Sequence, residues 1–217
     1  GMNGIIQELT GLLKTKNIGT DSDQALLLDF QTTLETKPEK AIKLEKDALA
    51  QIETITVDNA RLVSNLHANL GGLYRMNGHP DLAREHMEKS ISLLDQFNLL
   101  HINDSIPQIA NYAMFLTEQQ EPERGISELQ KLSGIIKEYH SDDCLDYAKV
   151  QETLGTIYLM TANLPQAKTH FKRAFKIYEK IWADEPEMIE AKYQEIQELY
   201  PQIGFCIGKN LSGLLTK

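Results

Sequence analysis

The sequence predicts an all-α protein of about four helix pairs, with a capping helix at each end. Prolines recur at intervals of 42 residues, at Pro38, Pro80 and Pro122. Small residues recur at the same interval of 42 residues, at Ala41, Ala83, Gly125 and Ala167. Stretches in which polar and apolar residues alternate, as they do in a half-buried strand, are nearly absent. A regular period of this length is typical of a chain built from stacked helical repeats.

The elements are expected in order along a single domain over residues 1–217. An N-terminal cap over residues 1–20 has its apolar residues on one helical face, at Ile5, Ile6, Leu9, Leu12 and Leu13. Four repeats follow, over residues 22–62, 64–104, 106–146 and 148–188. Residues 189–217 form the C-terminal cap and tail. The tail from Gly204 to Lys217 is either a short last helix or an end that packs on a neighbour.

Composition and charge argue against several classes of protein. The 217 residues are 41% hydrophobic and carry a formal net charge of −9, which argues against a nucleic-acid partner. No apolar run approaches the roughly 18 residues of a membrane span, and no signal peptide is recognised at the start of the sequence. Two cysteines are too few for a disulfide framework. A cytoplasmic protein without a membrane partner is therefore expected.

Six residues of the last repeat carry a recognisable pattern: Leu154, Gly155, Tyr158, Ala167, Phe171 and Ala174. The second repeat has nearly the same pattern, at Leu70, Gly71, Tyr74, Ala83, Met87 and Ser90. These residues resemble the signature of the tetratricopeptide repeat, and the resemblance covers roughly residues 22–188. The first and third repeats are weaker matches. The 42-residue period exceeds the usual 34 or so and is similar to that of kinesin light chain and many bacterial members.

The resemblance implies a right-handed α–α superhelix. Each repeat would be a pair of antiparallel helices, and Gly71 and Gly155 would let the two helices of a pair approach closely. Ala83 and Ala167 would lie opposite these glycines.

The resemblance also implies that the first helices of successive repeats line a concave groove for ligand peptides. Asn69, Asn111 and Thr153 precede the signature leucine or its equivalent in repeats two to four. An amide at this position could pair with a peptide backbone, because it has both a donor and an acceptor. Further groove residues are expected at Asn65, Gly72, Arg75, Met114, Lys149 and Thr156, with Ala68 and Met76 beside them. Because Arg75 and Lys149 are its only clear cations, the groove does not fit a receptor for C-terminal carboxylates.

No catalytic motif is recognised, and we expect no cofactor and no metal. His140, Asp143 and Cys144 lie close together but are too few for a zinc site, so a polar loop is expected there. His67 is either groove-lining or exposed. Lysines recur every four residues at Lys168, Lys172, Lys176 and Lys180, either as a docking strip for an acidic partner or as a solvated face paired with the acidic segment Asp184–Glu198.

The expected function is therefore to bind an unidentified protein or extended peptide without chemistry. Three alternatives remain open at this point. The chain could be a peptide-sensing regulator fragment related to bacterial pheromone receptors, although residues 1–20 are too short for a DNA-binding domain. It could also assemble with itself, for example as a homodimer, or be an enzyme with an unrecognised site.

Overall fold

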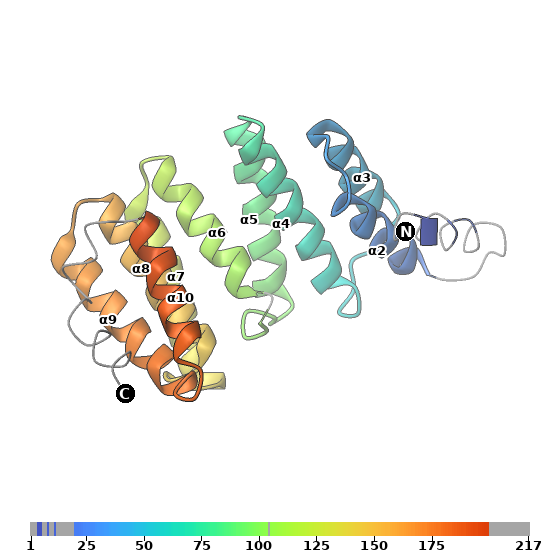
Figure 1. Cartoon of the computed structure of the whole chain (residues 1–217). Helices are drawn as coiled ribbons and strands as arrows, with labels where there is room; N and C mark the ends of the chain where they lie inside the picture. The colour runs from blue at the N-terminus through green and yellow to red at the C-terminus, as the bar shows by residue number, and fades with distance from the viewer. Residues whose placement is uncertain (1–3, 6–7, 9–10, 12–19, 104, 200–217) are drawn as a thin grey trace. The chain divides into compact units, whose positions relative to one another are not determined.

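The computed structural model describes residues 20–103 and 105–199, together with residues 4, 5, 8 and 11 (Figure 1). Every regular element within these ranges is a helix, which confirms the all-α prediction. None of the described helices is both long and apolar enough to cross a lipid bilayer. Most of the expected N-terminal cap and all of the tail from Gly204 to Lys217 lie outside the described residues.

The chain divides into two compact units, and the first of them is Gly1–Tyr112. In this unit α2 (Asp21–Thr32) pairs with α3 (Pro38–Ala50), and α4 (Ala60–Met76) pairs with α5 (Pro80–Gln96). Helix α4 also packs against α3, and one buried cluster joins Ala25 of α2, Ala48 of α3 and Leu66 of α4. These apolar contacts join the first two helix pairs into one core.

The second unit is Ala113–Lys217, and helix α6 (Ser105–Glu118) contains the boundary between the two units. Helices α7 (Pro122–Tyr139), α8 (Leu145–Met160), α9 (Leu164–Ile181) and α10 (Pro186–Leu199) follow. Helix α8 packs against both α7 and α9, and α10 packs against α9. The assignment of the whole chain to a single domain stays a prediction.

The turn inside the repeat recurs at the 42-residue period. Gly78, Gln120 and Ala162 have positive φ angles of 73°, 64° and 58°. The residue after each of them donates its N–H to the carbonyl five residues earlier: His79 to Tyr74, Glu121 to Leu116 and Asn163 to Tyr158, at 2.7–2.9 Å. This bond closes a helix C-terminus as in the Schellman motif. The same local geometry therefore ends the first helix of repeats two, three and four.

The periodic prolines begin the second helices. Pro38, Pro80 and Pro122 are the first residues of α3, α5 and α7. Proline is favoured there because its missing N–H would have no partner within the helix and its fixed φ angle is already helical. The period seen in the sequence is thus the distance between equivalent helix starts.

The signature glycines are contact points between paired helices, as predicted. A Cβ atom on Gly71 would lie 2.6 Å from Met87 Cγ and 3.3 Å from the Ala83 carbonyl oxygen. A Cβ atom on Gly155 would lie 2.8 Å from the ring of Phe171. Real Cβ atoms do not approach other atoms this closely, so a larger residue forces the side chains of Met87 or Phe171, or the helices that carry them, to move. The next residue, Gly72, has nothing within 4 Å of a built Cβ atom.

His67 faces neither the groove nor open solvent but the second helix of its own repeat. Its Nδ1 atom lies 2.9 Å from Nδ1 of His86, and the His86 ring stacks on Tyr74. Burial lowers the pKa of His67 to about 4, with a smaller contribution from the nearby charges of His86 and Lys89. Burial likewise lowers the pKa of His86. Two nitrogens this close can share a hydrogen bond only while at least one ring is neutral.

Repeat four provides a natural template for replacing this histidine. Gln151 stands 84 residues after His67, and its Oε1 lies 2.9 Å from Nδ1 of His170. We expect His67→Gln to keep the bond to His86 and to resist acid better than the wild type. A histidine with a lowered pKa costs stability as pH falls from 6.5 towards 4, because the unfolded chain takes up the proton first.

Urea unfolding at several pH values measures this difference. The advantage of His67→Gln should grow to about 1 kcal/mol near pH 5, after allowance for solvent screening of the half-buried ring. An advantage of the variant that does not change with pH would contradict the prediction.

Candidate binding groove

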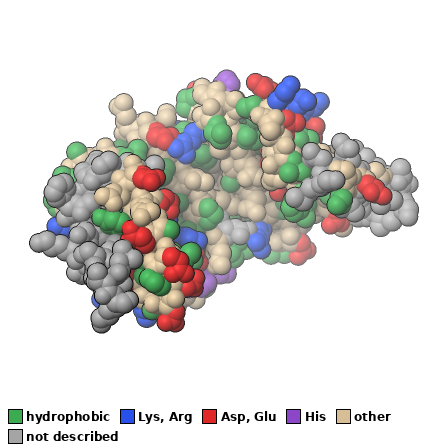
Figure 2. Space-filling model, viewed as in Figure 1, with side chains coloured by type: hydrophobic (Ala, Val, Ile, Leu, Met, Phe, Trp, Pro, Cys, Tyr) green, Lys and Arg blue, Asp and Glu red, His purple; other side chains and the backbone are tan. Residues whose placement is uncertain are grey.

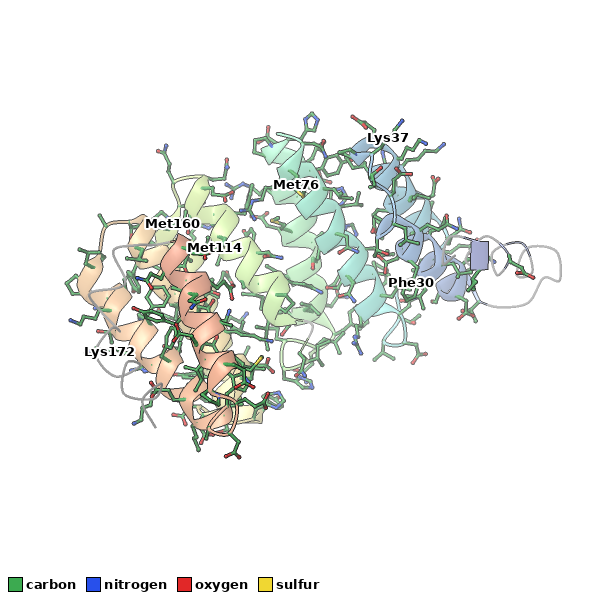
Figure 3. The ribbon with its side chains drawn as sticks, viewed as in Figure 1. Phe30, Lys37, Met76, Met114, Met160 and Lys172 are labelled. Carbon is green, nitrogen blue, oxygen red and sulfur yellow. The ribbon has the colours of Figure 1, made fainter. Side chains whose placement is uncertain are left out.

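A pocket of about 230 Å³ opens in the first unit between α4, α5 and the first turns of α6. Its lining combines small, apolar and amide side chains: Ala68, Gly72, Arg75, Met76, Met87, Ser90, Gln108 and Asn111. Gly72, Arg75 and Asn111 were predicted as groove residues, and the structure brings them together here. Met76, labelled on α4 in Figure 3, is 83% exposed.

A buried polar cluster fixes the α6 wall of this pocket. Gln108 Oε1 accepts hydrogen bonds from the hydroxyls of Ser64 (2.8 Å) and Ser90 (2.6 Å). The Gln108 amide nitrogen donates to Asn65 Oδ1, so Asn65 supports the wall rather than lining the pocket. The bonds to Ser64 and Ser90 are buried and the bond to Asn65 is partly buried, so removing either serine hydroxyl would leave a buried polar atom of Gln108 with one bond fewer. The cluster therefore holds Asn111, one turn further along α6, at the edge of the pocket.

Sequence reasoning missed Gln108. A signal was nevertheless present, because Ser64 and Ser90 stand where the last repeat has Ala148 and Ala174. Two hydroxyls in place of two methyl groups indicate a polar partner from another element.

Asn111 is the candidate whose amide is available to a ligand. It is exposed, and it makes no hydrogen bond to any described residue. Gly72 lines the same pocket, where the missing side chain leaves open space. The arrangement can offer one donor and one acceptor to a peptide unit, with apolar contacts nearby.

Asn69, at the equivalent position of the preceding repeat, already makes hydrogen bonds within the protein. Its amide nitrogen donates to Asp29 Oδ1 at 2.8 Å and to Glu45 Oε1 at 3.1 Å. Glu45 is completely buried on α3, and its other oxygen has no hydrogen-bond partner among the described residues. Burial and the neighbouring Asp29 carboxylate raise the pKa of Glu45 to about 8. Asn69 of repeat two thus stabilises an acid pair of repeat one, formed by the half-buried Asp29 and the buried Glu45.

The predicted groove residues of the second unit are bonded along their own helix. The hydroxyls of Thr153 and Thr156 donate to the carbonyls of Lys149 and Glu152, at 3.0 and 3.1 Å. Lys149 lies 3.7 Å from Asp146. Met114 is half-buried on α6. None of these four residues lines the pocket of the first unit.

A polar cluster occupies the corresponding place in the second unit. Glu152 stands 84 residues after Ala68, and its carboxylate accepts from the Tyr178 hydroxyl at 2.6 Å and lies 3.4 Å from Lys192 Nζ. Burial and the Glu152 carboxylate raise the pKa of Tyr178. Ala68 thus leaves space in the lining of the first-unit pocket, whereas the equivalent position of the second unit carries the larger, bonded Glu152.

The candidate metal residues of the α7–α8 loop have structural roles. Cys144 Sγ accepts from the backbone N–H of Tyr147 at 3.4 Å and so caps α8. Asp143 forms an ion pair with Lys180. Within the described residues, no group of three or more His, Cys, Asp or Glu side chains could hold a metal ion.

Comparisons with known proteins agree with the helical-repeat fold of the chain. Residues 105–180 match the family model described as tetratricopeptide repeat. The structure is similar to that of BtubC (BKLC) from P. vanneervenii, with a TM-score of 0.70 and 19% identity over 92% of this chain and 80% of the other.

Two further solved structures have the same fold. A protein of Podosopora anserina, assigned as a kinesin light chain with nearly identical TPR-like repeats, has a TM-score of 0.63 and 14% identity, over 83% of this chain and 90% of the other. MamA has a TM-score of 0.57 and 16% identity, over 82% of this chain and 89% of the other. No curated protein sequence matches the chain.

Proposed function

Since this chain carries tetratricopeptide repeats, we propose that it binds an extended protein segment in the pocket between α4 and α6. Repeats of this family generally serve as scaffolds for protein–protein interactions and are generally non-catalytic. The proposal for this chain is more specific: the ligand backbone pairs with the Asn111 amide, and a ligand side chain enters the space beside Gly72.

The observation that carries this proposal is the contrast between the two asparagines. Asn69 is committed to Asp29 and Glu45, whereas the Asn111 amide has no partner in the described chain. An exposed amide beside a cavity and an exposed methionine is suited to a peptide, because methionine adapts to differently shaped apolar side chains.

A peptide-display library selected on the wild-type protein supplies the ligand for the test. We expect Asn111→Ala to weaken binding of the selected peptides about tenfold, measured by fluorescence anisotropy, because one or two hydrogen bonds are lost. Gly72→Val should also weaken binding by filling the pocket. Neither variant should lower the melting temperature appreciably.

Thr153→Ala is the matched control, since Thr153 occupies the equivalent position in repeat four. Its effect on peptide affinity should be small. Equal affinity of all the variants and the wild type would remove the site assignment. Asn69→Ala is a poor probe of the groove, because it would also disturb the Asp29–Glu45 pair. Pheromone sensing and self-assembly stay predictions from the sequence, and light scattering distinguishes self-assembly from a monomer.

A further inference from the structure

A second pocket, of about 410 Å³, lies in the second unit beside α7 and α9. Its lining is mainly charged: Lys137, Asp142, Asp143, Tyr147, Arg173, Lys176, Ile177 and Lys180. Two buried residues, Tyr147 at the start of α8 and Ile177 on α9, supply the apolar part of the lining. None of these residues belongs to the groove proposed above.

The charge of this pocket is opposite to that of the protein. Four cationic side chains and two carboxylates line it, an excess of two positive charges in a chain whose net charge is −9. Acidic side chains instead gather along α10, where Figure 2 shows them on the surface. Among the described residues Lys180 pairs with Asp143, and no ion pair joins Lys176 to the acidic segment Asp184–Glu198.

Two of the four cations are already paired. Lys180 pairs with Asp143, and Lys137 Nζ lies 3.6 Å from Asp142 and 5.2 Å from the centre of the Tyr147 ring. These contacts hold the α7–α8 loop against α7 and α9. They leave Arg173 and Lys176 to account for the excess positive charge.

Arg173 and Lys176 have no carboxylate partner among the described residues. One guanidinium nitrogen of Arg173 donates to Gln151 Oε1 at 3.3 Å, which orients the group and leaves its other N–H donors available. Lys176 is exposed and makes no ion pair with any described residue. The two side chains are three residues apart and lie on the same face of α9.

We propose that this pocket binds a phosphate monoester, with Arg173 and Lys176 contacting the phosphate oxygens. A guanidinium presents a planar fork of donors that matches two phosphate oxygens, and an ammonium adds a point charge. A monoester carries nearly two negative charges at neutral pH, which equals the excess in the pocket. Tyr147 and Ile177 provide apolar surface for the organic group that carries the phosphate.

Phenyl phosphate is the probe, titrated against the full chain at low ionic strength by calorimetry. We expect saturable binding to the wild type that is weakened about tenfold or more in Arg173→Gln/Lys176→Gln. Lys168→Gln/Lys172→Gln is the matched control, since it removes the same charge from the same helix outside the pocket; Lys172 is labelled on α9 in Figure 3. The single variant Lys176→Gln, at an exposed site, keeps the test valid if the double variant folds poorly.

Three outcomes would overturn the proposal. They are no saturable binding to the wild type, equal loss in both double variants, and binding of benzoate as tight as that of phenyl phosphate. Titration with a phosphoserine peptide and with free O-phosphoserine then identifies the source of the phosphate. A tighter fit of the peptide indicates a protein-borne group, equal affinity indicates a small molecule, and either result supports the assignment.

Discussion

Gly155→Leu should lower the free energy of unfolding of the second unit by about 3 kcal/mol or more. A Cβ atom at this position would lie 2.8 Å from Cδ2 and Cε2 of Phe171, and a leucine adds three more carbons. Phe171 cannot move aside easily, because it is 1% exposed and packed in the core of the α8–α9 pair. The two helices would therefore have to separate.

Trp182 makes this effect measurable in the second unit alone. It is the single tryptophan of the chain, and it stacks on Tyr178 with ring centres 4.8 Å apart. Its fluorescence during urea unfolding reports on α9. Gly134→Leu is the matched control in the same unit, since a Cβ atom on Gly134 meets nothing within 4 Å. That substitution should stabilise α7 by about 1 kcal/mol through helix propensity. A Gly155→Leu protein as stable as the wild type would show that the contact does not limit packing.

The resemblance to the tetratricopeptide repeat was sufficient to predict these glycine contacts, because helix pairs that pack in the same way repeat the same close approach at the same position. It could not predict how close each approach is. Gly125 occupies the place of Ala83 and Ala167, so the pattern suggests that alanine would fit. In the structure a Cβ atom on Gly125 would lie 2.6 Å from the Ala113 carbonyl oxygen. That distance depends on the angle between α6 and α7, which no local pattern determines.

The candidate groove was predictable only in part, for a related reason. The repeat pattern places Asn69 and Asn111 at equivalent positions, and it cannot tell which amide is already bonded. The answer depends on Glu45, which stands where a large apolar residue belongs in the first repeat. This departure was visible in the sequence. Its consequence, a carboxyl group buried beside Asp29 and bonded to Asn69, required the packed structure.

The buried acid pair leads to the second large effect, which is a dependence of stability on pH. Glu45 has a pKa of about 8 in the folded protein against an ordinary value of 4.5, and burial also raises the pKa of Asp29. Between these two values the folded state holds a proton that the unfolded chain has released. The contribution of Glu45 to stability is therefore fully present below pH 4.5 and is lost as pH rises through the folded pKa. Above pH 6.5 the histidine pair adds little to this slope, since its rings are already neutral in both states.

Glu45→Gln should be more stable than the wild type at pH 8, by about 2 kcal/mol, and nearly equal to it at pH 4, below the unfolded pKa of the glutamate. Glutamine copies the protonated acid: its oxygen can accept from Asn69, and its amide can donate to Asp29 without a charge. Far-UV circular dichroism during urea unfolding measures both units, and Trp182 fluorescence separates the second from the first. Asp47→Asn removes an exposed charge from the same helix and should leave the slope between pH 6.5 and 8 unchanged. A wild-type slope retained in Glu45→Gln would mean that Glu45 is ionised in the folded protein, and that the amide of Asn69 with the surrounding helices solvates its charge.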